Sequence, residues 1–163
     1  MNNAKWRASI LLAALCAASI VRADEFVREF VEPVRVVWVS GGDVSSAASL
    51  LLRKRCQVPE SGWRWDRMSE NCCILSNGGS RASVLLDFGM ELHGGLRLAV
   101  GASSSKDMKL RVRFGESVGE AMSELGEKGS CNDHAIRDSE ILLPTMGTRE
   151  IGNTGFRFVR LDL

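Results

Sequence analysis

Hydrophobic and polar residues alternate most regularly between residues 83 and 114. In the segment 108–114, apolar residues at every second position are separated by three basic residues, which is typical of a strand buried on one side. The segments 83–88 and 96–100 repeat this alternation. Turn-forming residues separate them, DFG and HGG after the first segment and GASSSKD after the second. The pattern predicts three antiparallel strands with one packed face and one charged face.

Shorter patterns on either side predict further strands and one or two short helices. The additional strands are predicted over residues 34–40, 72–75 and 136–143. One helix is expected after Ser45 or Ser46, and a second after the capping box of Ser117 and Glu120. In the C-terminal run EIGNTGFRFVRLDL, the GNTG segment predicts a hairpin turn. Together the elements predict an all-β fold, an antiparallel β-sandwich of jelly-roll or concanavalin-like type.

Residues 1–23 have the pattern of a signal peptide. Lys5 and Arg7 form a basic start, an apolar run follows, and Ala23 offers a small residue at the cleavage point. The alternative is a buried N-terminal helix. Cleavage lowers the number of basic residues from 21 to 18, against 20 acidic ones, so the mature net charge is −2. We therefore expect an exported protein, periplasmic or extracellular.

The mature chain, residues 24–163, has the length of one domain with a proper core. Its near-neutral charge argues against a nucleic-acid partner, because phosphates require a strongly basic surface. The apolar run of the signal peptide is too short to span a bilayer, so no membrane association is expected after cleavage. Lys109, Arg111 and Arg113 are expected to form a solvated outer strand face and not an anion site.

Four cysteines remain after cleavage, namely Cys56, Cys72, Cys73 and Cys131. Export permits disulfides, and four cysteines allow three pairings. The side chains of Cys72 and Cys73 would point to opposite faces of an extended segment, which disfavours a bridge between them. The sequence is compatible with either one disulfide bridge or four free thiols. The chain has no CxxC pair, so neither a zinc site nor another cofactor is expected.

Five motifs follow one another along the chain: LLDFG, ELHGGLRL, KLRVRFGES, NDHAIRD and EIGNTGFRFVRLDL. The region that carries them, residues 34–163, resembles the β-sandwich region that precedes the catalytic barrel in bacterial α-L-rhamnosidase-like glycoside hydrolases. That family performs its chemistry in a large α-helical barrel after these motifs, and this chain does not contain the barrel. The resemblance implies a fragment or accessory module, inactive alone, whose partner is a catalytic barrel domain.

Trp63 and Trp65 are the first candidates for carbohydrate binding. Two positions apart, their rings would lie on one side of an extended segment. Aromatic rings stack on the apolar faces of sugars, and Arg64, Asp66 or Arg67 would supply polar contacts. The alternative is that both rings close one end of the core.

Asn132, Asp133 and His134 form the second candidate site, in a polar loop that also holds Asp138. Carboxylate and amide oxygens suit sugar hydroxyls or a cation. The alternative is an ordinary turn in which Asn132 or Asp133 binds its own backbone.

Asp87 and Glu116 are candidates for catalysis by residue type only. Glycoside hydrolysis needs two carboxylates about 5–10 Å apart across the scissile bond. The favoured interpretation is that both satisfy backbone groups at turns, so no catalytic residue is predicted.

The sequence gives rise to three hypotheses about function, in order of preference. The first is a non-catalytic module, and the second is a free-standing lectin-like carbohydrate-binding module. The third is a small hydrolase that uses Asp87 and Glu116.

Overall fold

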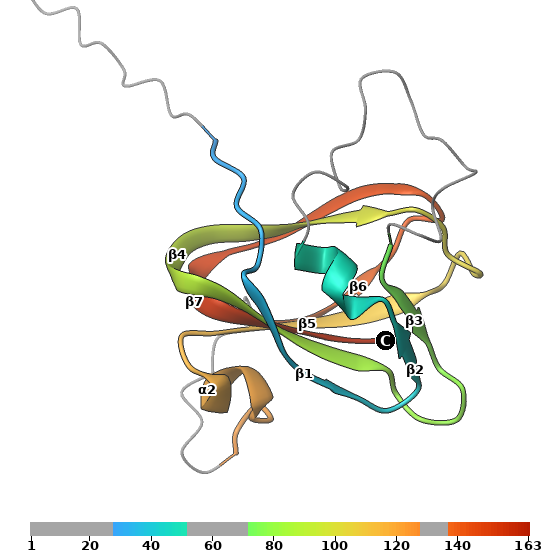
Figure 1. Ribbon diagram of the computed structural model, residues 1–163, viewed down its shortest axis with the longest axis horizontal. Helices are drawn as coiled ribbons and strands as arrows, with labels where there is room; N and C mark the ends of the chain where they lie inside the picture. The colour runs from blue at the N-terminus through green and yellow to red at the C-terminus, as the bar shows by residue number, and fades with distance from the viewer. Residues whose placement is uncertain (1–27, 52–71, 128–136) are drawn as a thin grey trace, which may run out of the picture. The chain divides into compact units, whose positions relative to one another are not determined.

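Two long strands, β4 (Ser83–Val100) and β7 (Gly147–Asp162), form the centre of the fold. The computed structural model of the chain describes residues 28–51, 72–127 and 137–163, and both strands belong to the unit Val31–Leu163. They pair antiparallel along most of their length. Figure 1 shows β4 and β7 bending together, so that they form one curved ribbon.

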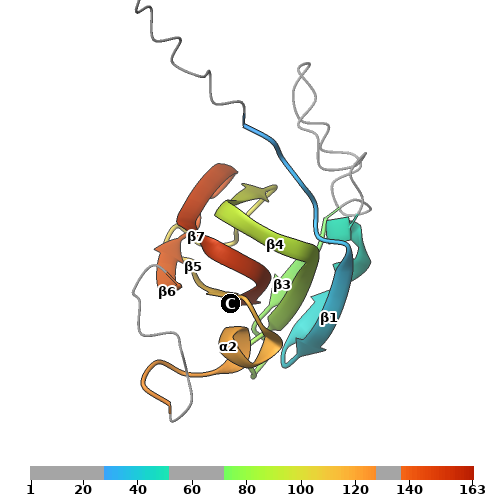
Figure 2. The ribbon, with the colours of Figure 1, turned by 90° about the vertical axis from the view of Figure 1, so that its left-hand side faces the viewer.

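Three shorter strands complete a five-stranded sheet with the order β1-β4-β7-β5-β6. They are β1 (Arg35–Ser40), β5 (Lys109–Gly115) and β6 (Asp138–Leu142). All of these neighbours are antiparallel, and Figure 2 shows β1 and β6 on opposite sides of β4 and β7. The predicted all-β antiparallel fold is confirmed. A sandwich of jelly-roll or concanavalin-like type stays a prediction.

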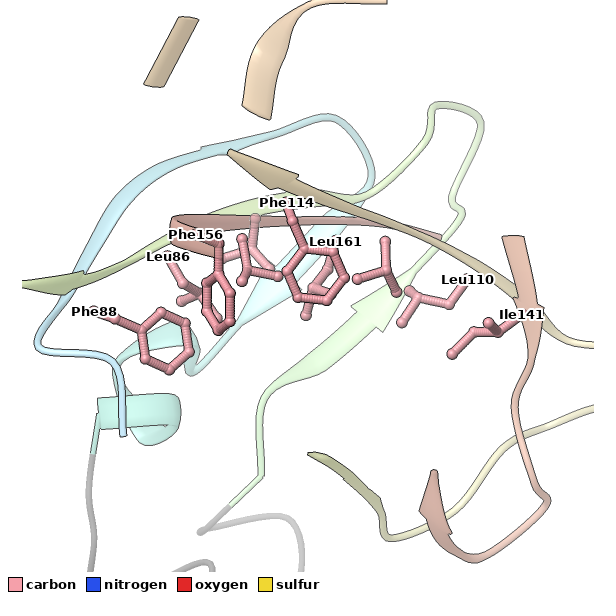
Figure 3. Packing of buried hydrophobic residues seen from close by; sticks show 10 residues of the cluster. Leu86, Phe88, Leu110, Phe114, Ile141, Phe156 and Leu161 are labelled. Atoms are coloured by element: carbon pink, nitrogen blue, oxygen red, sulfur yellow. The ribbon is translucent and has the colours of Figure 1, made fainter. Parts of the chain in front are cut away.

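The hydrophobic core lies on one face of the sheet, on the inner side of the bent ribbon. Its buried residues are Val84, Leu86, Phe88, Leu110, Val112, Phe114, Ile141, Phe156, Val159 and Leu161. Figure 3 shows Phe156 between two other rings, and its ring centroid lies 5.5 Å from that of Phe88 and 5.1 Å from that of Phe114. Leu92 and Leu96 of the second half of β4 pack against the same cluster. The two halves of the ribbon therefore share one core.

Two predicted turns are wrong, because the chain continues through them as strand. The DFG and HGG segments lie inside β4, and GNTG lies inside β7. The pairing of β4 with β7 shifts register between Asp87 and Leu92 and again between Gly94 and Leu96. Gly89, with φ of 79°, lies within the first shift. The glycines therefore permit irregular pairing and a bend where the sequence pattern predicts chain reversal.

The second face of the sheet is covered by the short helix α2 (Val118–Met122). Its capping box is partly as predicted: the Ser117 side chain accepts a hydrogen bond from the Glu120 amide, while the Glu120 carboxylate accepts one from the amide of Glu116. Ala121 packs with Leu85 and Phe158 in a small apolar cluster.

The expectation of a solvated basic strand face is wrong for one of its three residues. Only 1% of the Arg113 side chain is exposed, whereas Lys109 lies open to solvent. Arg113 donates hydrogen bonds to the backbone carbonyls of Met122 and Ser123, at and beside the C-terminal end of α2. The helix thus covers one end of the basic row and leaves the other end exposed.

A two-stranded sheet and a 3-10 helix complete the described elements. The sheet pairs β2 (Asp43–Ser45) with β3 (Ile74–Ser76), and the helix η1 spans Ala47–Leu51. Strand β3 overlaps the predicted strand over residues 72–75, and the helix expected after Ser45 or Ser46 begins at Ala47 as a 3-10 helix. The sequence pattern does not predict strand β2. Leu75 of β3 and Leu50 of η1 pack against the core cluster.

Gly152 in β7 gives a direct test of this packing. Its φ is 91°, and a Cβ atom built on it would lie 2.7 Å from Cζ of Phe114. We expect Gly152→Ala to lower the free energy of unfolding by roughly 1–3 kcal/mol, because the added methyl group overpacks the core. Urea unfolding measures the change. Gly79→Ala is the matched control, since its φ of 110° is also positive but no atom lies within 4 Å of its Cβ position, and equal losses in the two variants would contradict the interpretation.

Candidate functional site

The residues predicted to bind carbohydrate lie outside the part of the chain that the structure describes. Trp63 and Trp65 belong to residues 52–71, and Asn132, Asp133 and His134 belong to residues 128–136. The same holds for Cys56, Cys131 and the signal peptide. These assignments stay predictions.

Asp87 and Glu116 lie on or next to strands that are not neighbours in the sheet. Strand β7 lies between β4, which carries Asp87, and β5, which ends just before Glu116. Glu116 accepts a hydrogen bond from Nη2 of Arg137 at 2.6 Å and is about half exposed. The two carboxylates thus have separate partners and lie on non-neighbouring strands.

The Asp87 carboxylate is buried, and its acceptor sites are filled. Oδ1 accepts from the Gly89 amide at 2.8 Å and from Nε of Arg157 at 2.9 Å. Oδ2 accepts from Nη2 of Arg35 at 2.7 Å and from Nη2 of Arg157 at 3.2 Å. An ionised carboxylate offers about four acceptor positions, so Asp87 has none left for a substrate proton. The predicted bond to a backbone amide is present, and the two arginines are additional.

This environment holds the pKa of Asp87 well below its usual range. The hydrogen bonds from Arg157 are the main cause; burial acts in the opposite direction, and the Gly89 amide and Arg35 add to the lowering. A depressed pKa means that the charged form is stabilised in the folded protein, which is the reverse of what a general acid at neutral pH requires.

The Asp87 environment predicts acid sensitivity. A carboxyl group whose pKa is lower in the folded state contributes stability above its unfolded pKa of about 4, and that contribution is lost as the pH falls below this value. Urea unfolding from about pH 7 down to about pH 2 should therefore show a smaller acid-dependent loss for Asp87→Asn than for the wild type. Asp107→Asn, at an exposed carboxylate, should keep the wild-type slope, and an unchanged slope in Asp87→Asn would contradict the prediction.

Asp162 is a second buried carboxylate with all its acceptor positions filled. Oδ1 accepts from the Ser83 hydroxyl at 2.6 Å and from Nε of Arg160 at 2.8 Å. Oδ2 accepts from Nη2 and Nε of Arg113 at 2.7 and 3.2 Å. Burial by itself would raise the pKa of Asp162, but the hydrogen bonds from these three residues outweigh it and lower the pKa. Asp162 therefore ties β4, β5 and β7 together.

An open groove of about 570 Å³ lies at the end of the sheet where β4 and β5 begin and β7 ends. Asn77, Ser80 and Arg81 contribute to it from the loop between β3 and β4. Ser105 and Asp107 contribute from the loop before β5. Its remaining polar lining comes from the strands, namely Lys109, Arg111, Glu140 and Asp162. Sequence inspection missed this groove because its two loops are far apart in the chain, and only the sheet order brings them together.

The described residues show neither a metal site nor a disulfide. Cys72 and Cys73 are both half-buried free thiols. Burial raises the pKa of Cys73, and the neighbouring Cys72 adds to the increase. Within residues 28–51, 72–127 and 137–163, no three His, Cys, Asp or Glu side chains are grouped so that they could hold a metal ion. No helix in these ranges is long and apolar enough to cross a membrane.

The chain matches no protein-family model, and no curated protein is similar to it in sequence. A function must therefore be inferred from the arrangement of its side chains and from the motifs in its sequence.

Proposed function

We propose that this chain is a non-catalytic β-sheet module of an exported α-L-rhamnosidase-like glycoside hydrolase, which supports a catalytic barrel and contacts carbohydrate. The main support is the state of Asp87 and Asp162, two buried carboxylates of the sheet. Each accepts four hydrogen bonds, mostly from arginine, and each has a lowered pKa. Groups held in this way stabilise the fold and cannot exchange protons with a substrate near neutral pH.

The five ordered motifs are the reason for proposing the α-L-rhamnosidase-like family. LLDFG supplies Asp87, KLRVRFGES supplies Arg113, and the last motif supplies Asp162. Three of the five motifs thus contain a residue of the buried ionic contacts on one face of the sheet. In the proposed module these motifs stabilise the sheet and do not form a catalytic centre.

An activity assay tests the non-catalytic part of the proposal. The mature chain from Asp24, incubated with 4-nitrophenyl α-L-rhamnoside, should release no nitrophenol above the buffer blank. Turnover that is lost in Asp87→Asn or Glu116→Gln would overturn the proposal in favour of a small hydrolase. An active α-L-rhamnosidase in a parallel reaction shows that the assay works.

The partner and the export signal need separate tests. Reading the gene beyond the Leu163 codon should reveal a continuing frame that encodes a helical barrel, and an immediate stop codon would contradict the fragment hypothesis.

When the chain is expressed with residues 1–23, the periplasmic fraction should contain a protein whose mass corresponds to a chain that begins at Asp24. Recovery of the uncleaved chain from the cytoplasm would contradict export.

A further inference from the structure

The groove at the end of the sheet has features that point to a class of ligand. Its volume of about 570 Å³ falls within the usual range of sites for small molecules, roughly 300–1,000 Å³. Most of its lining residues carry polar or charged side chains, Met108 and Leu163 add apolar surface, and the groove is open to solvent. A ligand that fits such a surface must offer many hydrogen-bonding groups of its own.

The charges of the groove balance. Three lining residues are cationic and three are anionic, namely Arg81, Lys109 and Arg111 against Asp107, Glu140 and Asp162. Lys109 pairs with Glu140 at 2.7 Å, and Arg111 pairs with Asp138 at 2.6 Å. The hydrogen bond from Lys109 is the main cause of the lowered pKa of Glu140, and the positive charge of Arg81 adds to the lowering. With no excess of either sign, the groove has no field that would select a phosphate or another strongly charged ligand.

Two polar groups on separate loops remain available to a ligand. The Asp107 carboxylate, on the loop before β5, has no hydrogen-bond or ion-pair partner among the described residues. Asn77, on the loop before β4, accepts a hydrogen bond from the Ala82 amide through Oδ1, which leaves its two amide N–H groups for other acceptors. The groove thus combines a free acceptor with free donors. A hydroxyl group both donates and accepts, so neighbouring hydroxyls on a sugar ring match this combination.

We propose that this groove binds a short neutral oligosaccharide, with Asp107 accepting and Asn77 donating hydrogen bonds to its hydroxyl groups. The inference extends the proposed function, since it assigns the carbohydrate contact of the module to a defined surface. It is separate from the sites predicted at Trp63 and at Asn132.

Binding is tested by titrating the ¹⁵N-labelled mature chain with the neutral disaccharide α-L-rhamnosyl-(1→6)-D-glucose and recording amide shifts. The shifts should be concentrated in the two loops of the groove and at the start of β5. Asp107→Ala should weaken binding by roughly 10-fold or more, because a hydrogen bond to a charged group is lost. Lys106→Ala is the matched control, since Lys106 is the exposed neighbour of Asp107 and does not line the groove.

Three results would overturn the inference. The first is the absence of amide shifts at sugar concentrations up to about 10 mM, which lies beyond even weak binding. The second is an unchanged affinity in Asp107→Ala, and the third is tighter binding of digalacturonic acid than of the neutral sugar. The last result would indicate an anion site. Circular dichroism of each variant verifies that it is folded. Hydrolysis of the rhamnoside would overturn the non-catalytic function alone, whereas absence of binding without hydrolysis would overturn the groove inference alone.

Discussion

Replacing Asp162 with Ala should lower the free energy of unfolding by about 3–5 kcal/mol, which would place this substitution among the most damaging in the chain. The Asp162 side chain is fully buried, and that of Arg113 is 1% exposed. Removing the carboxylate leaves the buried Arg113 guanidinium with only the largely exposed Glu124, at 3.0 Å, as a charged partner, and a poorly compensated buried charge is costly. Urea unfolding followed by circular dichroism measures the loss.

Two further variants separate the buried pair from ion pairs in general. Glu140→Ala removes the partner of Lys109, and both of these side chains are more than half exposed. That variant should lose far less stability than Asp162→Ala, because exposed pairs contribute little. The double variant Arg113→Met with Asp162→Leu should be more stable than Asp162→Ala, since the buried guanidinium is removed together with its carboxylate, and Arg160, which is 15% exposed, is the least exposed group that loses an ion pair. Equal losses in Asp162→Ala and Glu140→Ala would show that burial of the pair is not decisive.

Phe156→Ala should also cost about 3–5 kcal/mol, for a different reason. Phe156 is 2% exposed and makes edge-to-face contacts with both Phe88 and Phe114. Truncation leaves a cavity between two rings that cannot close easily, since they belong to different strands. The midpoint of urea unfolding should fall, with no change in the slope of the free energy against urea concentration.

Leu142→Ala provides the control for Phe156. Leu142 lies on the edge strand β6 and is 55% exposed, so its truncation should change stability by no more than about 0.5 kcal/mol. Phe156→Leu should cost less than Phe156→Ala, because much of the volume is kept. A loss in Leu142→Ala similar to that in Phe156→Ala would contradict the assignment of the core.

Alternation along the chain predicts the faces of the regular strands well. Val84, Leu86 and Val112 lie in the core, where the period-two pattern places them. Alternation fails at the irregular pairings. Phe156 and Phe158 are both even-numbered, yet Phe156 joins the main core and Phe158 joins the cluster under α2. The register shift between Asp87 and Leu92 pairs these residues with Phe158 and Phe156, which lie 71 and 64 positions further along the chain, and no local pattern contains such pairing.

Glycine explains why the predicted turns are absent. Gly–Gly after His93 and the GNTG segment have the composition of turns, but that composition is equally suited to bulges and bends within a strand. Predicting solvent exposure from the pattern of charged residues has a similar limit, as Arg113 shows. In an alternating strand a basic residue is expected to face solvent, and only the approach of α2 and Asp162 reveals that it is buried. The groove likewise depends on the sheet order and on no single motif.

The strand order also has a consequence for how the molecule assembles. The central strand β7 is the last in chain order, and it separates β4 from β5, which precede it. During synthesis, the edges of β4 and β5 that pair with β7 therefore keep unpaired backbone N–H and C=O groups until β7 inserts between them. Strands that are far apart in the chain pair slowly, so the nascent chain should depend on protection from aggregation until β7 is complete.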